Sequence, residues 1–147
     1  MRIILDTNII VSGLISEHGA PAQLLNAWTN KAFILVTSAT QITEIQSVTH
    51  RPTVRPLITP AHATRFINDL HRLATVLDRL PVVDRLRDPN DNYLLAMAEA
   101  GAAEYLVTGD KRDVLALKRH GNTTIITATE MLPLLGIWQT APRKSAS

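Results

Sequence analysis

The chain has 147 residues, the size of one ordinary domain, which is long enough to bury a hydrophobic core of its own. Its 46% hydrophobic and 19% charged content is typical of a soluble globular protein, and it contains no apolar run near the roughly 18 residues that a membrane span needs. The sequence has no cysteine, which excludes a disulfide framework and thiolate chemistry, and its net charge of +2 is only weak evidence about partners. No secretory signal is recognisable at its start, so we expect a cytoplasmic protein.

The first elements follow from short apolar runs and the residues that break them. Arg2–Leu5 is rich in β-branched residues and predicts a buried strand that ends at Asp6. Ile9–Ile15 is apolar, and we expect it to turn at Ser12–Gly13. Pro21 then suits the first turn of a helix, whose apolar face would carry Leu24, Leu25 and Trp28.

The middle of the chain repeats this alternation. Phe33–Val36 predicts a second buried strand, followed by Thr37–Ser38 as the cap of a helix over Ala39–Val48. Prolines punctuate residues 51–60, after which Ala61–Leu73 has the spacing of an amphipathic helix. Thr75–Leu77 is compatible with a short strand.

The last third begins with a polar stretch from Pro81 to Asn92. A helix over Tyr93–Ala100 should follow, closed by Gly101 as its C-terminal cap. The remaining predicted elements are a strand at Tyr105–Val107, a helix at Val114–Lys118, a strand at Thr124–Ile126 and a helix at Thr129–Leu135. This alternation predicts an α/β fold with a mainly parallel central sheet, in one domain over residues 1–140 with a disordered tail at 141–147.

Four acidic residues fall where such a fold would gather them. Ligands of open parallel sheets bind beyond the carboxyl ends of the strands. Asp6 directly follows the first strand, and Asp110 lies shortly after the strand at 105–107. Glu44 sits in the helix after the second strand, and Asp91 stands at the start of the helix that precedes Tyr105. We therefore expect these four carboxylates at one edge of the sheet.

Each of these acids also has a purely structural explanation. Asp6 can turn the chain together with Asn8, and Glu44 can be a solvated helix residue. Asp91 and Asp88 stand where helix caps belong, and Asp110 and Asp113 can be turn formers. The joint pattern, rather than any single residue, favours a functional site.

Carboxylates that share a small crevice repel one another, which raises some of their pKa values unless a cation compensates. The sequence offers no Cys or His spacing typical of zinc, so an oxygen-preferring cation such as Mg²⁺ or Mn²⁺ is favoured. Such an ion activates water and neutralises charge in a phosphoryl displacement. The acid pattern thus predicts a metal-dependent site for phosphoryl displacement.

Four segments in this order resemble a PIN-domain protein. They are Leu5–Gly13 with its Asp-Thr-Asn opening, Glu44, Arg87–Asn92 with Asp-Pro-x-Asp-Asn, and Val107–Asp113 with Thr-Gly-Asp. More narrowly, they are similar to the VapC-type ribonucleases, the toxins of bacterial toxin–antitoxin systems. The resemblance extends from the first strand to about Leu135.

The resemblance implies a three-layer α/β/α fold and Mg²⁺-dependent cleavage of RNA, with Mn²⁺ as a possible substitute. It also implies a cognate antitoxin protein that blocks the site, and frequent homodimers. Carried over by position, the catalytic and metal-binding acids are Asp6, Glu44, Asp91 and Asp110. Of these, Asp6, Asp91 and Asp110 would hold the essential ion, while Glu44 would bind a second metal or orient the attacking water.

Several neighbours complete the expected site. Asp88 competes with Asp91 for the same role, and Asp113 competes with Asp110 or lies in an outer shell. Asn8 and Thr108 are placed to orient acids or water, or else satisfy backbone groups. Basic residues form small clusters that can meet phosphates or be ordinary solvated surface; the expected RNA contacts are Lys111, Arg112 and Arg51.

Three other functions remain open at this point. A catalytically inactive PIN-fold protein that binds RNA or another partner would use the acids only as caps. A phosphatase of the haloacid dehalogenase type needs a second Asp two residues after the first, where this chain has Asn8. A receiver domain needs a paired acid site and a lysine after a later strand, which Lys111 beside Asp110 imitates poorly.

Overall fold

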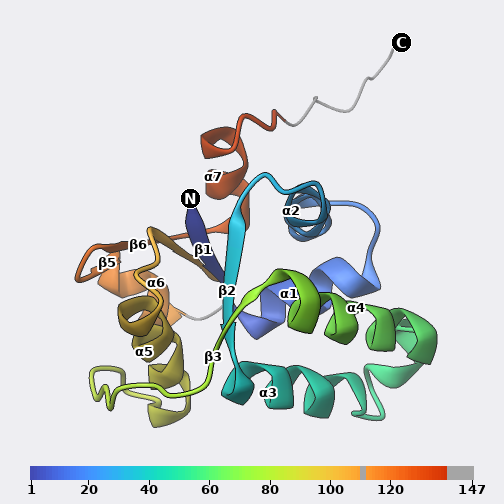
Figure 1. Ribbon diagram of the computed structural model, residues 1–147, viewed down its shortest axis with the longest axis horizontal. Coiled ribbons are helices and arrows are strands. Elements are labelled where there is room, and N and C mark those ends of the chain that lie inside the picture. Colours follow the sequence, from blue (N-terminus) through green and yellow to red (C-terminus); the bar gives the residue numbers. More distant parts are fainter. Residues whose placement is uncertain (110–111, 139–147) are drawn as a thin grey trace.

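A computed structural model of the protein describes residues 1–109 and 112–138. A six-stranded sheet in the order β3-β2-β1-β4-β6-β5 forms its centre (Figure 1). All neighbouring pairs are parallel except β5 and β6, which pair antiparallel at one edge. The strands are β1 (Arg2–Leu5), β2 (Ile34–Ser38), β3 (Thr75–Leu77), β4 (Tyr105–Val107), β5 (Arg119–His120) and β6 (Thr123–Ile126). The predicted α/β fold with a mainly parallel sheet is confirmed.

Helices cover both faces of this sheet. In Figure 1, α5 and α6 lie to the left of β2, and α1 to α4 lie to its right. The helices are α1 (Thr7–Ile15), α2 (Ala20–Thr29), α3 (Ala39–Thr49), α4 (Pro60–Leu73), α5 (Asn92–Ala100), α6 (Arg112–Leu117) and α7 (Ala128–Leu134). Two short 3₁₀ turns, η1 (Arg55–Leu57) and η2 (Pro89–Asp91), complete the described elements. The three-layer α/β/α arrangement follows from this coverage.

The core lies on both sides of β1, the central strand. Ile3 and Leu5 pack into the cluster formed with α1 to α4 and α7, whereas Ile4 packs into the cluster formed with α5 and α6. Alternate side chains of a strand point to opposite faces, so a strand covered on both faces must be apolar throughout. This requirement explains the continuous Ile-Ile-Leu run that predicted the strand.

The order of the strands creates a topological switch point beside β1. The chain first builds β2 and β3 on one side of β1, and then adds β4 and β6 on the other. Leu5 of β1 pairs with Val107 of β4, so the two strands end at the same level. Ligands of open α/β sheets bind where the connections diverge in this way, and the carboxyl ends of β1 and β4 are that place here.

One local prediction was wrong. The expected turn at Ser12–Gly13 does not form, because α1 continues through both residues to Ile15. Gly13 is favoured by packing rather than by a turn, since a Cβ there would lie 2.6 Å from Leu25 Cδ1 and 3.0 Å from Pro21 O, both of α2. The glycine allows α1 and α2 to approach closely.

The second strand and one edge strand also differ from expectation. β2 continues beyond Val36 to Ser38, and Ser38 also caps α3, because its Oγ accepts a 3.1 Å hydrogen bond from Gln41 N. The two-residue strand β5 was not predicted. The expected tail at residues 141–147 lies outside the described residues. Within the described ranges, no helix is both long and apolar enough to cross a membrane.

Candidate active site

Asp6 lies at the switch point, immediately after β1, and its side chain is fully buried. Its backbone N–H extends the ladder to Val107 O at 2.9 Å, and its carbonyl accepts from Ile9 N and Ile10 N in the first turn of α1. The Asp6 carboxylate therefore stands at the N-terminus of α1, where exposed N–H groups favour negative charge. Thr108, buried at the end of β4, donates from Oγ1 to Asp6 Oδ2 at 2.8 Å.

Glu44 reaches toward the same edge from the second turn of α3 and is partly buried. Its Oε1 accepts a hydrogen bond from Thr7 Oγ1 at 2.5 Å and a short one from the Tyr93 hydroxyl. The Thr7 and Tyr93 hydroxyl oxygens are themselves 3.2 Å apart. Glu44 thus joins α3 to the segment just after Asp6 and to the start of α5.

Gln41, one turn before Glu44 on α3, stabilises this arrangement through hydrogen bonds to neighbouring elements. Its Oε1 accepts from Thr37 Oγ1 at 2.7 Å, and its Nε2 donates to Leu5 O at 2.8 Å and to Thr7 Oγ1 at 3.4 Å. The side chain is fully buried, so these polar contacts satisfy an amide that would otherwise be costly to bury. Gln41 therefore fixes α3 against the carboxyl end of β1.

Tyr93 is partly buried at the start of α5 and donates a hydrogen bond to Glu44. Its burial raises the pKa of the phenol above the ordinary value, and its hydrogen bond to Glu44 and the charges of Glu44 and Asp6 raise that pKa further. The contact with Thr7 acts in the opposite direction without cancelling the effect. Tyr93 therefore stays a neutral hydrogen-bond donor to Glu44.

The loop before α5 gives different roles to its two aspartates. Asp88 is exposed and caps η2, since its Oδ1 accepts a 2.9 Å hydrogen bond from Asn90 N. Asp91 is partly buried at the N-cap position of α5, two residues before Tyr93. Asn92 is buried, and its Oδ1 accepts from Arg85 N at 3.1 Å and from Leu86 N at 2.9 Å. Asn92 thereby anchors the segment that leads into this loop.

The other expected site residues lie at several separate places, and two of them fall outside the described residues. Asp110 and Lys111 lie outside the described residues. Arg112 and Asp113 belong to the first turn of α6, where Asp113 is exposed, and Asn8 is exposed in the first turn of α1. Arg51 follows the C-terminus of α3, the end of that helix remote from β2, and so it is not gathered with Asp6 and Glu44.

The donor set of the site consists of oxygen atoms. Carboxylates and hydroxyls suit Mg²⁺ or Mn²⁺, and the chain has no cysteine to favour a softer ion. Within residues 1–109 and 112–138, no group of three or more His, Cys, Asp or Glu side chains is close enough together to hold a metal ion. Asp6, Glu44 and Asp91 carry oxygen donors of the type that a hard cation prefers, but these three described residues do not by themselves form such a group, and Asp110 lies outside the described ranges.

Sequence reasoning did not single out Tyr93, Gln41 or the Thr7 hydroxyl. A tyrosine within the apolar run that forms α5 is the one available signal, because a buried phenol needs a hydrogen-bond partner. The partner itself, Glu44, is 49 residues away in the chain. Local pattern does not reveal such a pairing.

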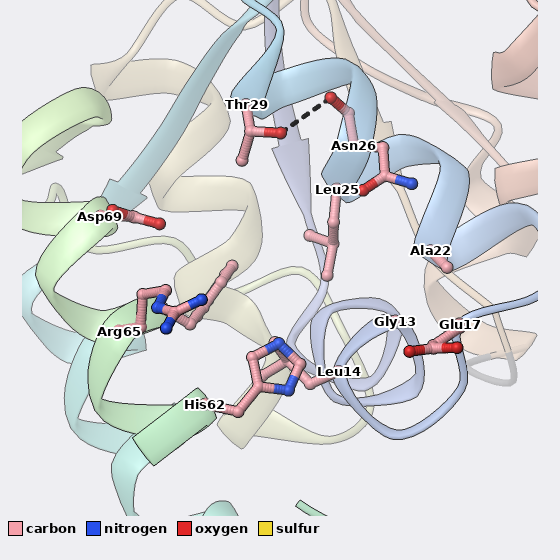
Figure 2. Close-up of a pocket in the computed structure, with 11 residues that line it drawn as sticks. Gly13, Leu14, Glu17, Ala22, Leu25, Asn26, Thr29, His62, Arg65 and Asp69 are labelled. Carbon is pink, nitrogen blue, oxygen red and sulfur yellow. Dashed lines mark hydrogen bonds between the residues drawn. The ribbon is translucent and has the colours of Figure 1, made fainter. Parts of the chain in front are cut away.

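A cavity of about 420 Å³ lies away from this site, between α1, α2 and α4 (Figure 2). Its lining residues from α1, Gly13 and Leu14, lie at the C-terminal end of that helix, whereas Asp6 and Thr7 lie at the N-terminal end. The residues that line it are Gly13, Leu14, Glu17, Ala22, Leu25, Asn26, Thr29, His62, Arg65, Phe66 and Asp69. The acidic site is thus not part of this hollow.

A comparison with known protein families finds a match over most of the chain. The family model for the PIN domain matches residues 2–112, which include β1, Glu44, the loop before α5 and Thr108. A comparison with the curated proteins found no match, and neither did a comparison with the solved structures. The matched segment is well over half of the chain and holds the strand ends and helices that build the acidic site. This chain belongs to the PIN domain family.

Proposed function

We propose that the protein is a Mg²⁺-dependent ribonuclease whose active site is centred on Asp6 and Glu44. PIN domains are generally nucleases, hydrolases that use divalent metals and act on nucleic acid. The observation that carries the proposal is the hydrogen bond from Thr7, directly after Asp6, to Glu44, which brings Glu44 to the switch point of the sheet where the buried Asp6 lies. Acidic groups at this position match the requirement for a metal-assisted phosphodiester cleavage.

Asp6, Asp91 and Asp110 would hold the essential ion, and Glu44 would bind a second ion or orient the attacking water. The bound ion would supply activation of water and neutralisation of phosphate charge. Thr108 holds one oxygen of Asp6, while Thr7 and Tyr93 hold one oxygen of Glu44. These hydroxyls restrict the rotamers of the acids, which lowers the entropic cost of assembling the site.

RNA would approach over the start of α6. Arg112 begins that helix, directly after Lys111 in the sequence, and both can meet backbone phosphates. Replacing both residues by alanine should weaken RNA binding and reduce its salt dependence, by about 0.7 in the log–log slope for each single-strand phosphate that is no longer neutralised. Arg51 is remote from Glu44 along α3. The effect of Arg51→Ala on RNA binding tests whether the bound RNA extends to that residue.

We further propose that the protein is the toxin of a toxin–antitoxin pair, acts in the cytoplasm and forms homodimers. This narrower assignment is supported by the order and spacing of the motifs around Asp6, Glu44, Asp91 and Asp110. Induced expression should arrest growth, and co-expression of a small protein encoded beside it should restore growth. Analytical ultracentrifugation of the purified chain would show whether it sediments as a dimer.

A second candidate is a catalytically inactive PIN-fold module that binds RNA. The hydrogen bonds of Glu44 to Tyr93 and of Asp88 to Asn90 favour it, because they give these acids structural roles. Calorimetric titration with Mg²⁺ separates the two functions, because an active nuclease must bind the ion and a module whose acids only support the fold need not. Binding of RNA without binding of Mg²⁺ would support the inactive module.

The test of the proposed function uses the purified chain with end-labelled single-stranded RNA and DNA of the same sequence. Cleavage of RNA is expected with Mg²⁺ or Mn²⁺, should stop with EDTA, and should return when the ion is restored in excess. Equal cleavage of DNA would keep the nuclease but reject ribonuclease specificity. No cleavage of either strand under any ion would reject the proposed activity.

A further inference from the structure

Glu44 receives two hydroxyl hydrogen bonds on the same carboxylate oxygen. Thr7 Oγ1 and the Tyr93 hydroxyl both donate to Oε1, and the two hydroxyl oxygens are 3.2 Å apart. The donors come from different elements, the first turn of α1 and the first turn of α5. Neither donor uses the second oxygen, Oε2.

The direction of each hydrogen bond is determined by its surroundings. Thr7 Oγ1 accepts from Gln41 Nε2 at 3.4 Å, so its single proton is free to point to Glu44. Gln41 is held in turn by Thr37 Oγ1 at 2.7 Å and by Leu5 O at 2.8 Å. The Tyr93 hydroxyl is directed at Glu44 Oε1, and a carboxylate oxygen can only accept. Both hydroxyls therefore donate to the Glu44 carboxylate.

The same two donors are tied to the other acids through the backbone. Thr7 directly follows Asp6, and Tyr93 comes two residues after Asp91. A shift of Glu44 would therefore disturb its hydrogen bonds to Thr7 and Tyr93, which are close in sequence to Asp6 and Asp91. A carboxylate on α3 would otherwise be free to sample several rotamers, and ordering it during ion or substrate binding would reduce affinity.

We propose that Tyr93 and Thr7 are positioning residues for Glu44, which fix Oε1 and leave Oε2 to face the cation or the attacking water. This inference rests on the proposed function, because it assigns Glu44 a part in that site. The competing explanation is that Tyr93 is a core residue whose hydroxyl merely takes the nearest acceptor. In that case its removal would change stability but not the properties that depend on Glu44.

A double-mutant cycle distinguishes the two explanations. Tyr93→Phe, Glu44→Gln and the double variant are compared for RNA cleavage as a function of Mg²⁺ and for Mn²⁺ binding measured by electron paramagnetic resonance. Tyr93→Phe should raise the half-saturating Mg²⁺ concentration about 10-fold, as expected when a metal ligand is deprived of a supporting hydrogen bond. The same change should have no further effect when Glu44→Gln is already present. Effects that multiply in the double variant would overturn the inference.

Two matched controls separate positioning from packing. Tyr105→Phe removes the same atom from the other tyrosine of the chain, which lies at the amino end of β4, and should leave the metal dependence unchanged. Thr7→Ser keeps the hydroxyl, whereas Thr7→Val keeps the shape and removes the hydroxyl. Thr7→Val should reproduce the metal defect of Tyr93→Phe, and Thr7→Ser should behave like the wild type. Equal behaviour of Ser and Val would contradict the assignment.

The outcomes distinguish failure of this inference from failure of the proposed function. If the wild-type protein cleaves RNA and Tyr93→Phe has the same metal dependence, only the positioning role is wrong. If the wild-type protein does not cleave RNA, Mn²⁺ binding by the variants decides whether the positioning role holds. Weaker binding in Tyr93→Phe and Thr7→Val, but not in Tyr105→Phe, would then support the positioning role. Unchanged binding in those variants, or no binding by the wild type, would overturn it.

Discussion

Thr108 and Asp6 are 102 residues apart in sequence, yet the Thr108 hydroxyl donates a 2.8 Å hydrogen bond to Asp6 Oδ2. Both side chains are fully buried at the carboxyl ends of the neighbouring strands β4 and β1. A buried carboxylate is tolerated only with hydrogen-bond donors or opposite charge nearby. This hydrogen bond therefore links the stability of the sheet centre to the orientation of the acid on which the proposed chemistry depends.

Thr108→Val should remove that donor while keeping the side-chain shape. We expect a decrease of about 1–3 kcal/mol in the free energy of unfolding, the usual cost of depriving a buried polar group of a partner. RNA cleavage should also fall, because Asp6 no longer accepts the hydrogen bond that orients it. Thr108→Ser, which retains the hydroxyl, should cleave faster than Thr108→Val. Urea unfolding and initial cleavage rates measure the two effects, and equal rates for Ser and Val would refute the orienting role.

Asn92→Ala should destabilise the segment that precedes α5. The Asn92 amide oxygen accepts from Arg85 N and Leu86 N, and Leu86 is buried, so its N–H would be left without this partner. A cost of about 1–3 kcal/mol is expected, together with faster amide exchange at residues 85 and 86. Asn68→Ala, at an exposed position on α4, is the matched control and should change stability by no more than about 0.5 kcal/mol. Unchanged exchange in Asn92→Ala would contradict the anchoring role.

Tyr93 should make the protein less stable in alkali. Burial raises the pKa of its phenol above 10.0 in the folded state, so above pH 10 the folded chain keeps a proton that the unfolded chain releases. The stabilisation is complete below about pH 10 and declines as pH rises further, by up to about 1.4 kcal/mol per pH unit. The difference in unfolding free energy between wild type and Tyr93→Phe should follow this decline. Urea unfolding from about pH 8 to 11 tests it, with Tyr105→Phe as the baseline, and a pH-independent difference would refute it.

Much of the fold could be predicted because local pattern and tertiary burial agree. The Ile-Ile-Leu run of β1 and the apolar spacing of α4 each reflect a surface that must be buried. β5 escaped prediction because two polar residues, Arg119 and His120, carry no apolar signal. Its pairing with β6 depends on the neighbouring strand rather than on its own sequence.

Glycines show where local reasoning fails. Gly13 was interpreted as a turn residue, but it allows contact between α1 and α2. Gly101 does occupy the C-cap of α5 as expected, yet its φ is −92°, and it is Ala102 that adopts a left-handed conformation with φ of 49°. A Cβ at Gly101 would lie 2.6 Å from Val36 Cγ1, so close packing explains this glycine. Such contacts are set by distant residues and leave no local signature.

The same distinction applies to the candidate site. From the sequence, Asp6 and Glu44 could be expected near one edge of the sheet, because parallel strands end there together, and Thr7, next to Asp6, does donate to Glu44. The hydroxyls that hold them, such as Tyr93 on Glu44, depend on helix packing and were not predicted. The choice of Asp91 over Asp88 remains a prediction, although the capping bond of Asp88 to Asn90 gives that residue a structural role.

The most direct test of the central claim is the rate of Mg²⁺-dependent RNA cleavage by Asp6→Asn. Asparagine has the same shape and can still accept a hydrogen bond from Thr108, so circular dichroism and urea unfolding should report an intact fold. Glu104→Gln, which alters an exposed acid at the amino end of β4, serves as the control and should cleave like wild type. We predict that Asp6→Asn cleaves RNA at least about 100-fold more slowly, because the carboxylate is needed to hold the ion. Cleavage by folded Asp6→Asn at the wild-type rate would contradict the proposed active site.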